Sequence, residues 1–401
     1  MAGALDGVKV LDFAWALVGG ITTKILADCG AEVVKLESST RPCLSRIDVQ
    51  VSASSPTSFD DKPWFAHLNT SKKSLRLDMK HRRAREVIEP LIDWADVVVE
   101  NFSPGTMKKL GLDYEALRQG RPDIVMVSGS VYGQTGPLAQ EWGIDGTAGA
   151  VSGRLALTGY PDRPPVTPGA VPYGDVVLPY LMAGAACAAL DRRRRTGEGA
   201  HIDASMYEVV TQQMTPNLVA YQRGRPLARS GNRSPDVLFQ GVYPTRGEDR
   251  WIAITIHDAP DWAAFTSHLG GDWPSPAAVQ AMSSADLDAL DARVAAFTAG
   301  RQDAALMADL QELGLAAGVV QDAEDLVDRD PQIRHRGSLV PIEHPLLGVF
   351  GHQATPFRLS RTPIAVRRAP SLGEHVDEVC RDIAGMSPET IETLRQEGLF
   401  T

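Results

Sequence analysis

The chain contains little cysteine, and its spacing supports neither a disulfide framework nor a zinc site. Four cysteines occur in 401 residues, far apart and without a C-x-x-C pair: Cys29, Cys43, Cys187 and Cys380. Such usage is typical of a reducing compartment. We therefore expect a cytoplasmic protein that binds no metal.

Positive charge is also in short supply. The chain has 40 Lys and Arg against 50 Asp and Glu, a formal net charge of -10. This balance argues against a nucleic-acid or membrane-surface partner, so an anionic ligand would need a local group of cations. Residues 1–7 lack the basic and apolar segments of a signal peptide. The apolar run 176–190 is too short to span a bilayer. We expect no nucleic-acid and no membrane partner.

The first half of the chain has an α/β pattern. Residues 8–14 read as a buried strand, 21–30 as a helix closed by Gly30, and 31–37 as a second strand. Such a βαβ unit implies a parallel sheet. The pattern recurs as helix 85–95, strand 96–102, helix 113–119 and strand 123–131. No G-x-G-x-x-G follows the first strand, which removes the main support for a nicotinamide-dependent dehydrogenase.

The length predicts more than one domain. We expect the first part of a large α/β domain over 1–222, a linker rich in Arg, Gly and Pro over 223–235, a small α+β domain over 236–316 and a return to the large domain over 317–401. The small domain contains a β-hairpin at 241–256, turning at 246–249, and helices at 285–299 and 304–314. A last helix is expected near 388–397.

Asp175 opens the apolar run 176–190, which ends in charged residues and glycine as a buried helix does. Two interpretations are open. Asp is a favoured N-cap residue, and by position alone a structural cap is the better one. Alternatively, the positive end of the helix keeps the carboxylate ionised near neutral pH, and the carboxylate is a nucleophile.

Several segments of the chain, taken in order, resemble the class III CoA-transferases. They are LDGVKVLDFA, ILADCGAEVVKLE, NTSKKSLRLDMK, ADVVVENFSPGTMKKLGLDYEALR, PDIVMVSGSVYGQTGP, RRRRTGEGAHIDASMYE, AGVVQD and SLGEH. The resemblance implies a Rossmann-like large domain built from both chain ends, a smaller α+β domain between them, and an interlocked dimer. It also implies acyl-CoA and a free carboxylic acid as substrates, with no tightly bound cofactor.

The resemblance implies site residues as well. Asp175 stands where the family has its nucleophile, which forms an acyl-aspartyl anhydride and then an aspartyl-CoA thioester. The implied CoA-binding residues are Ala16, Leu17, Val18, Leu68, Lys72, Lys73, Asn101, Phe102 and Lys109. The chain departs from relatives at Leu17, where a polar residue is common, and at Ser38, where a basic one is found. Arg41 or Arg46 would then substitute for that basic residue.

Two other functions stay open. Racemase relatives carry a His where this chain reads Gly143-Ile144-Asp145, and Ile144 cannot transfer a proton, although His257 is a possible base. The second open function is that of one subunit in a hetero-oligomeric CoA-transferase. We therefore expect either a homodimer or a heteromer with a related chain. Within the family, the segment DFAWALVGGITTKILAD and the overall length resemble the succinyl-CoA:benzylsuccinate CoA-transferase group. Residues 231–241 lack the glycine run of formyl-CoA transferase, which disfavours oxalate as a substrate.

Overall fold

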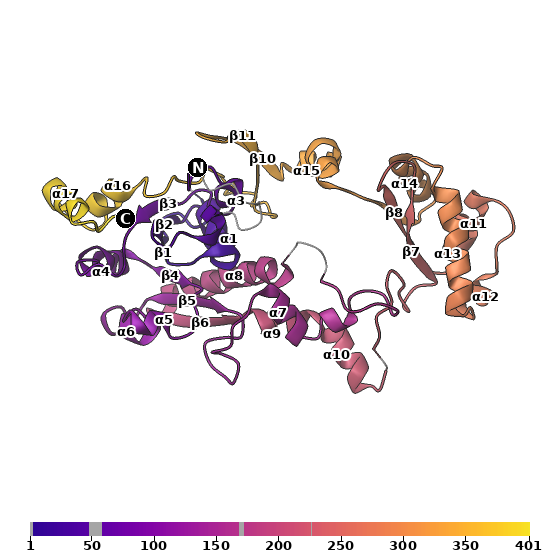
Figure 1. Cartoon of the computed structure of the whole chain (residues 1–401), viewed down its shortest axis with the longest axis horizontal. Helices are drawn as coiled ribbons and strands as arrows, with labels where there is room; N and C mark the ends of the chain where they lie inside the picture. The colour runs from indigo at the N-terminus through magenta and orange to yellow at the C-terminus, as the bar shows by residue number, and fades with distance from the viewer. Residues whose placement is uncertain (1–2, 48–57, 168–171, 226) are drawn as a thin grey trace. The chain divides into compact units, whose positions relative to one another are not determined.

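The computed structural model describes residues 3–47, 58–167, 172–225 and 227–401. The chain divides into two compact units (Figure 1). The large unit comprises Met1–Arg154, Gly169–Arg223 and Gln332–Thr401, and the small unit comprises Leu155–Pro168 and Gly224–Pro331. Part of the polar segment 38–62 lies outside the described residues.

A parallel six-stranded sheet forms the centre of the large unit, as the βαβ pattern predicts. Its strand order is β3-β2-β1-β4-β5-β6. This is the order of doubly wound nucleotide-binding folds, in which ligands bind outside the carboxyl ends of the strands where the order reverses, here between β1 and β4. The strands are β1 (Lys9–Asp12), β2 (Glu32–Glu37), β3 (Lys73–Arg76), β4 (Val97–Glu100), β5 (Val125–Ser130) and β6 (Ala200–Ser205).

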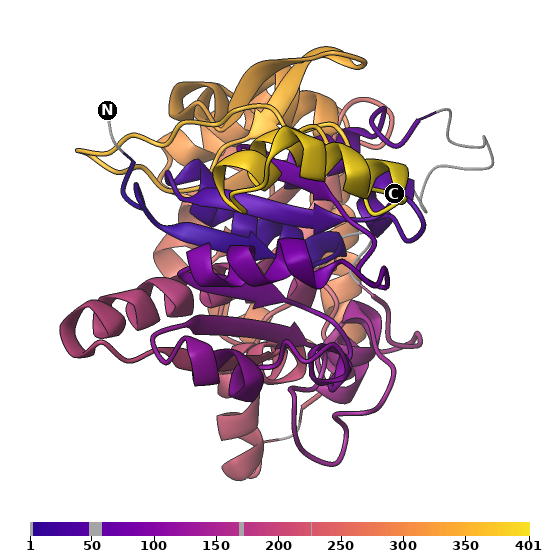
Figure 2. The ribbon, with the colours of Figure 1, turned by 90° about the vertical axis from the view of Figure 1, so that its left-hand side faces the viewer.

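Helices cover both faces of this sheet, so its strands are apolar on both sides (Figures 1 and 2). One face packs against α4 (Arg85–Trp94), α6 (Tyr114–Gly120), α16 (Val376–Asp382) and α17 (Pro388–Gln396). The other packs against α1 (Ala16–Asp28), α8 (Tyr173–Thr196) and α9 (Met206–Gln213). Because α16 and α17 join the core formed by the first strands, both chain ends build the large unit.

Shorter elements complete the large unit. β10 (Leu339–His344) and β11 (Gly348–Gln353) form an antiparallel hairpin of their own. The remaining helices are α2 (Leu44–Ile47), α3 (Pro63–Leu68), α5 (Thr106–Lys109), α7 (Asp145–Val151) and α10 (Thr215–Gln222), while α15 (Pro331–Arg336) starts at the boundary of the units.

An antiparallel sheet of order β7-β8-β9 forms the small unit. The predicted hairpin is present, with residues 246–249 between β7 (Phe239–Pro244) and β8 (Trp251–Ile256). The return to the large unit was expected at 317, but β9 (Ala316–Val320) pairs with β8 and so belongs to the small sheet. The helices are α11 (Ala259–Leu269), α12 (Pro276–Gln280), α13 (Ser284–Thr298) and α14 (Asp303–Glu312), with short helical turns at Leu155–Leu157 and Asp325–Arg329.

Helix α8 is longer than the apolar run that predicted it. It has 24 residues, and an 18-residue window has a mean hydropathy of 1.4, so by length and composition it suffices to cross a bilayer. The sequence-based judgement that the run is too short is therefore wrong for the helix as a whole. One such helix is weak support for a membrane span, because core helices meet the same criterion. Here α8 packs on α1, β5 and β6, and 33% of the window is buried within this chain.

Candidate active site

The carboxylate of Asp175 takes no part in capping its helix. α8 begins at Tyr173, so Asp175 is its third residue, and the N-cap residue is Pro172. An acid at this position ordinarily accepts a hydrogen bond from the N–H of the N-cap residue, but proline has none. Pro179 likewise provides no N–H for the Asp175 carbonyl oxygen, four residues before it. Within the described residues, the Asp175 carboxylate has no hydrogen-bond partner, so the N-cap interpretation does not hold.

Asp145 fixes the turn that precedes Asp175. This residue begins α7, and its Oδ1 accepts a short hydrogen bond from the backbone N–H of Gly174. The approach requires glycine, because a Cβ at position 174 would lie 2.5 Å from Cγ of Met206 and 2.9 Å from Oδ1 of Asp145. Two acidic side chains therefore meet at the start of α8.

The pKa of Asp175 is raised to about 7, first by burial and second by the negative charge of Asp145. The sequence predicted that the helix end would keep this carboxylate ionised near neutral pH. That expectation is only half met, because at pH 7 the protonated and ionised forms are both populated. A perturbed pKa of this kind is frequent at functional sites.

A cation lies beside Asp145. The guanidinium of Arg154 is 4.0 Å from Oδ2 of Asp145 and stands 5.0 Å from the centre of the Tyr173 ring. At 4.0 Å the contact is an ion pair and no hydrogen bond. The described residues contain no group of three or more His, Cys, Asp or Glu side chains arranged to hold a metal ion.

The carboxyl ends of β1 and β4 are joined by a pair of hydrogen bonds. The N–H of Trp15 donates to Oδ1 of Asn101 at 2.7 Å, and Nδ2 of Asn101 donates to the Trp15 carbonyl at 2.8 Å. The rings of Trp15 and Phe102 meet edge to face, 5.9 Å apart. The N-cap residue of α1, Trp15, forms no side-chain cap hydrogen bond, and the positive end of the helix lies at this edge of the sheet, where an anion is stabilised.

A cavity of about 180 Å³ opens at the carboxyl ends of β4 and β5. Its walls include Asn101, Phe102, Ser130, Tyr132 and Trp142. The chain runs from this wall through Gly143 to Asp145, the residue that holds Gly174.

Several residues predicted to contact CoA lie together at the β1–β4 junction. Ala16, Leu17 and Val18 form the first turn of α1, and Asn101 and Phe102 follow β4 directly. Ala16 has a positive φ of 52°, unusual for a residue with a side chain, and its N–H donates to Sγ of Cys43 at 3.2 Å. Backbone strain of this kind is frequent at ligand sites.

The other predicted CoA contacts are placed differently. Lys109 is exposed at the end of α5, which follows β4. Leu68 is 5% exposed and packs on α1 at Gly20. Lys72 is buried, and its ammonium donates to Asn69 Oδ1 at 2.8 Å and lies 3.3 Å from Asp12 Oδ2. Lys73 begins β3 at the opposite, amino-terminal edge of the sheet. The structure therefore does not bring Lys73 to the junction, whereas the Lys72 ammonium reaches Asp12 at the end of β1 but is buried there.

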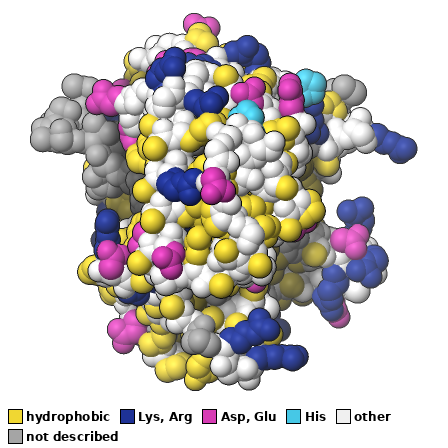
Figure 3. All heavy atoms as spheres, turned by 90° about the vertical axis from the view of Figure 1, so that its right-hand side faces the viewer, with side chains coloured by type: hydrophobic (Ala, Val, Ile, Leu, Met, Phe, Trp, Pro, Cys, Tyr) yellow, Lys and Arg dark blue, Asp and Glu magenta, His cyan; other side chains and the backbone are white. Residues whose placement is uncertain are grey.

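Of the two arginines expected to replace a basic residue at Ser38, only Arg41 faces the junction. Its guanidinium lies 5.8 Å from the centre of the Trp15 ring. Arg46 is fully buried, pairs with Glu37 at 2.8 Å and Asp60 at 2.7 Å, and lies 3.3 Å from the Phe65 ring centre. Figure 3 shows basic and acidic side chains interspersed on one face of the molecule.

Sequence reasoning missed Glu100, the last residue of β4. Its Oε2 accepts the Phe102 N–H at 2.8 Å and so supports the turn after the strand. Burial raises the pKa of Glu100 to about 6. The available signal was an acid that ends an otherwise apolar strand directly before Asn101.

Comparisons with known proteins identify the family. Residues 5–376 match the model of CoA-transferase family III. The chain is 32% identical to a succinyl-CoA–D-citramalate CoA-transferase of Chloroflexus aurantiacus, over 98% of this chain and 96% of that protein. It is 30% identical to a formyl-CoA:oxalate CoA-transferase of Rhodopseudomonas palustris, over 99% and 97%. A CAIB/BAIF family protein from Brucella suis superposes with a TM-score of 0.83 at 28% identity, over 96% of this chain and 100% of that one. The chain therefore belongs to CoA-transferase family III and is an enzyme of the CoA-transferase class.

Proposed function

We propose that the enzyme transfers CoA from an acyl-CoA to a carboxylic acid through covalent intermediates on Asp175. The observation that carries this proposal is the Asp175 carboxylate, which is partly buried in the first turn of α8 and has no structural partner among the described residues. A carboxylate that the fold leaves unused beside a second acid is a nucleophile candidate in a CoA-transferase.

The reaction consists of four nucleophilic attacks, each at a carbonyl carbon. An oxygen of ionised Asp175 attacks the thioester carbonyl, and the C–S bond breaks to give an acyl-aspartyl anhydride and CoA thiolate. The thiolate attacks the aspartyl carbonyl and expels the donor acid, leaving an aspartyl-CoA thioester. The acceptor carboxylate attacks that thioester to form a new anhydride and release CoA thiolate. The thiolate then attacks the new acyl carbon, which yields product acyl-CoA and restores Asp175. No proton is gained or lost overall.

CoA is proposed to bind at the β1–β4 junction. The first turn of α1 at 16–18 and the Asn101–Phe102 turn line the pantetheine arm of CoA, and the N-terminus of α1 faces an anionic group of the ligand. Lys109 and Arg41 are the exposed cations proposed for its phosphates. Asp145 acts as a positioning residue that holds Gly174, and with it the backbone before Asp175.

We propose succinyl-CoA as donor and an aromatic or dicarboxylic acid as acceptor. The similarity to a succinyl-CoA–D-citramalate CoA-transferase over nearly the whole chain supports a dicarboxylate. A panel of CoA esters combined with free acids, with products identified by mass spectrometry, tests this assignment. Transfer confined to formyl-CoA and oxalate would contradict it.

We also propose a cytoplasmic dimer of interlocked chains, either two copies of this chain or this chain with a related one. Support comes from apolar side chains left exposed on two helices of the large unit: Tyr180 and Leu181 of α8 and Leu218, Val219 and Tyr221 of α10. Size-exclusion chromatography with light scattering tests the homodimer. A monomer that is inactive alone and becomes active with a related chain would identify a heteromer instead.

Chemical trapping tests the mechanism. We expect hydroxylamine, added with acyl-CoA, to convert Asp175 to a hydroxamate, and borohydride to reduce the aspartyl-CoA thioester, with both products located by peptide mass spectrometry. Asp175→Asn should give neither product, whereas Asp191→Asn, a change to an exposed acid on the same helix, should leave both unchanged. Trapping at another residue, or full activity of Asp175→Asn, would disprove the assignment.

The racemase alternative makes a different prediction. An acyl-CoA racemase exchanges the α-proton of a chiral acyl-CoA with solvent deuterium without an acceptor acid. The site places Ile144, 73% exposed, directly before Asp145. We expect no deuterium uptake in the absence of acceptor, and fast uptake would replace the transferase mechanism by a racemase mechanism.

A further inference from the structure

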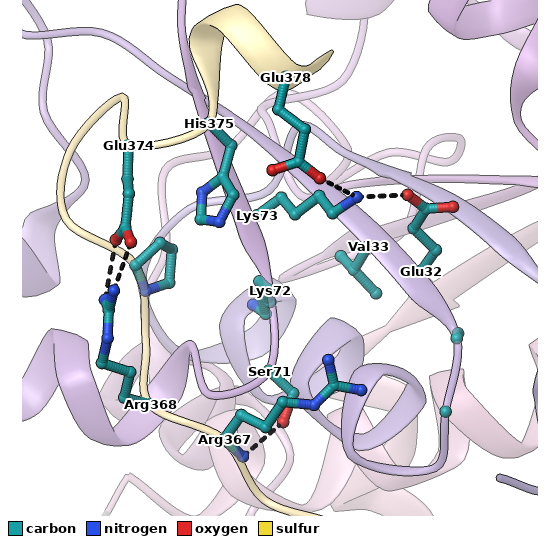
Figure 4. Close-up of a pocket in the computed structure, with 13 residues that line it drawn as sticks. Glu32, Val33, Ser71, Lys72, Lys73, Arg367, Arg368, Glu374, His375 and Glu378 are labelled. Carbon is teal, nitrogen blue, oxygen red and sulfur yellow. Dashed lines mark hydrogen bonds and ion pairs between the residues drawn. The ribbon is translucent and has the colours of Figure 1, made fainter. Parts of the chain in front are cut away.

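A second cavity, of about 450 Å³, lies in the large unit at the amino-terminal edge of the sheet. Glu32 begins β2 and Lys73 begins β3, whereas the candidate active site lies at the carboxyl ends of the strands. The segment 367–378 closes the cavity, so both chain ends contribute to its walls (Figure 4). Its size is within the range of small-molecule sites.

One wall carries an unbalanced negative charge. The ammonium of Lys73 lies 2.6 Å from Oε1 of Glu32 and 2.7 Å from Oε1 of Glu378. One cation between two carboxylates leaves a net charge of about -1 on this wall.

Arg367 carries an unbalanced positive charge. Its backbone is fixed to the start of β3, because its N–H donates to Ser71 Oγ and its carbonyl accepts the Ser71 N–H, both at 3.0 Å. Within the described part of the chain, its guanidinium forms no ion pair. The neighbouring Arg368 is neutralised by Glu374, because its Nη1 donates to Oε2 of Glu374 at 2.8 Å. Figure 4 shows the Lys73 group on one side of the cavity and Arg367 on the other.

His375 supplies a neutral hydrogen-bond donor to the same cavity. Its Nδ1 accepts the Ser74 N–H at 3.2 Å, so the proton of the neutral ring is on Nε2. Burial is the main cause that lowers the pKa of His375, which keeps the ring neutral near pH 7. In Figure 4 the ring lies beside the Lys73 side chain, on the side of Glu374.

We propose that this cavity binds a small zwitterion, an amino acid whose carboxylate lies against Arg367 and the Nε2–H of His375. Its ammonium joins Lys73 between Glu32 and Glu378. Two ammonium groups then face two carboxylates, and the guanidinium faces a third. A simple anion or a simple amine neutralises one wall and leaves the other unbalanced, so the electrostatics favour a ligand that carries both charges.

Calorimetry on the full chain, without acyl-CoA, tests the proposal independently of CoA transfer. The probes are straight-chain amino acids from glycine to 6-aminohexanoate, together with the acid and the amine of matching length. We expect at least one amino acid to bind with a Kd at least tenfold lower than that of either matching half. Equal affinity for the acid alone, or no binding by any amino acid, would overturn the proposal.

Two variants locate the site. Arg367→Gln and Glu378→Gln should each raise the Kd of the preferred amino acid at least tenfold with an unchanged melting temperature. Arg118→Gln changes an exposed arginine on α6 of the same unit and should leave the Kd as it is. Unchanged binding in a folded Arg367→Gln protein would place the ligand elsewhere and overturn the assignment.

Discussion

The carboxylate of Asp145 accepts a hydrogen bond from the backbone N–H of Gly174, the residue directly before Asp175. One acid thus positions the turn from which a second acid projects. It also repels the charge of that second acid and raises its pKa. Positioning and pKa control of the proposed nucleophile therefore come from the same side chain, and the two effects can be separated by substitution.

Asp145→Asn should move the acid limb of the pH–rate profile to lower pH. The pKa of Asp175 is raised to about 7, and the ionised form is the proposed nucleophile, so kcat/KM for acyl-CoA should rise with pH through about 7 in the wild type. Asparagine keeps an oxygen for the Gly174 N–H but removes the negative charge. Burial, the larger cause, remains, so the limb should move only part of the way toward 3.8. A limb that stays in place would show that Asp145 has no electrostatic role.

Asp175→Asn should stabilise the fold while abolishing activity. A carboxyl whose pKa is higher in the folded than in the unfolded chain binds its proton more tightly when folded, so stability falls as pH rises from about 4 to about 7. The shift from 3.8 to about 7 sets an upper bound of about 4 kcal/mol, which partial exposure reduces. Asparagine does not ionise, so this loss should disappear.

Thermal melting at two pH values checks this expectation. The melting temperature of Asp175→Asn should exceed that of the wild type at pH 8 and match it at pH 4, while CoA transfer falls roughly a thousandfold or more. Asp191→Asn, an exposed acid paired with Arg195 on the same helix, should show neither effect. A variant less stable than the wild type at pH 8 would indicate that the Asp175 carboxylate stabilises the folded chain.

Gly174→Ala should impair both stability and activity. The added methyl group would lie 2.5 Å from Cγ of Met206 and 2.9 Å from Oδ1 of Asp145, so α9 or the Asp145 turn must move. Overpacking of this kind costs about 1–3 kcal/mol, and displacement of the turn misdirects the nucleophile. Urea unfolding and steady-state rates measure the two effects. Gly120→Ala, where nothing lies within 4 Å, is the matched control and should change neither. Normal activity in Gly174→Ala would show that the close contact does not position Asp175.

Local patterns predicted the elements of the sheet well. The strand expected over 31–37 was confirmed, because burial on both faces produces continuous apolar strands. The helix expected over 21–30 begins earlier, at Ala16, but Gly30, with a φ of 108°, follows its end as expected. The start of α8 was less accurate. The apolar run begins at 176, but the helix starts at Tyr173, since Pro172 and not the acid is its N-cap residue.

Contacts between distant segments could not be read from the sequence. Strand β9 pairs with β8, about 65 residues earlier, so its membership of the small sheet depends on a non-local ladder that no local pattern encodes. The same limit applies to Lys72 and Lys73. Successive residues of a strand point to opposite faces, and nothing local indicates that Lys72 meets Asp12 in the core.

Lys72 and Lys109, both proposed from family resemblance as CoA contacts, should behave differently when substituted. Lys72 is buried. Without its ammonium, Asp12 would keep one cationic partner, the more distant Lys35 at 3.8 Å. Removing one partner of a buried ion pair costs about 3–5 kcal/mol of folding stability. Because Lys35 remains near Asp12, we expect the cost of Lys72→Met to lie at the lower end of this range. Lys109 is exposed, so Lys109→Met should leave the melting temperature unchanged. It should raise KM for acyl-CoA roughly 3- to 10-fold, an effect that shrinks as salt is added.

Melting curves and salt-dependent kinetics on both variants distinguish the roles. For Lys72→Met we expect a lower melting temperature and, at a temperature where the variant is folded, an unchanged salt dependence of KM. If Lys72→Met instead raised KM in a salt-dependent manner without loss of stability, its ammonium would have to leave Asp12 to reach the CoA phosphates. The resting structure argues against this, because that movement would leave Asp12 fully buried with only one cation nearby.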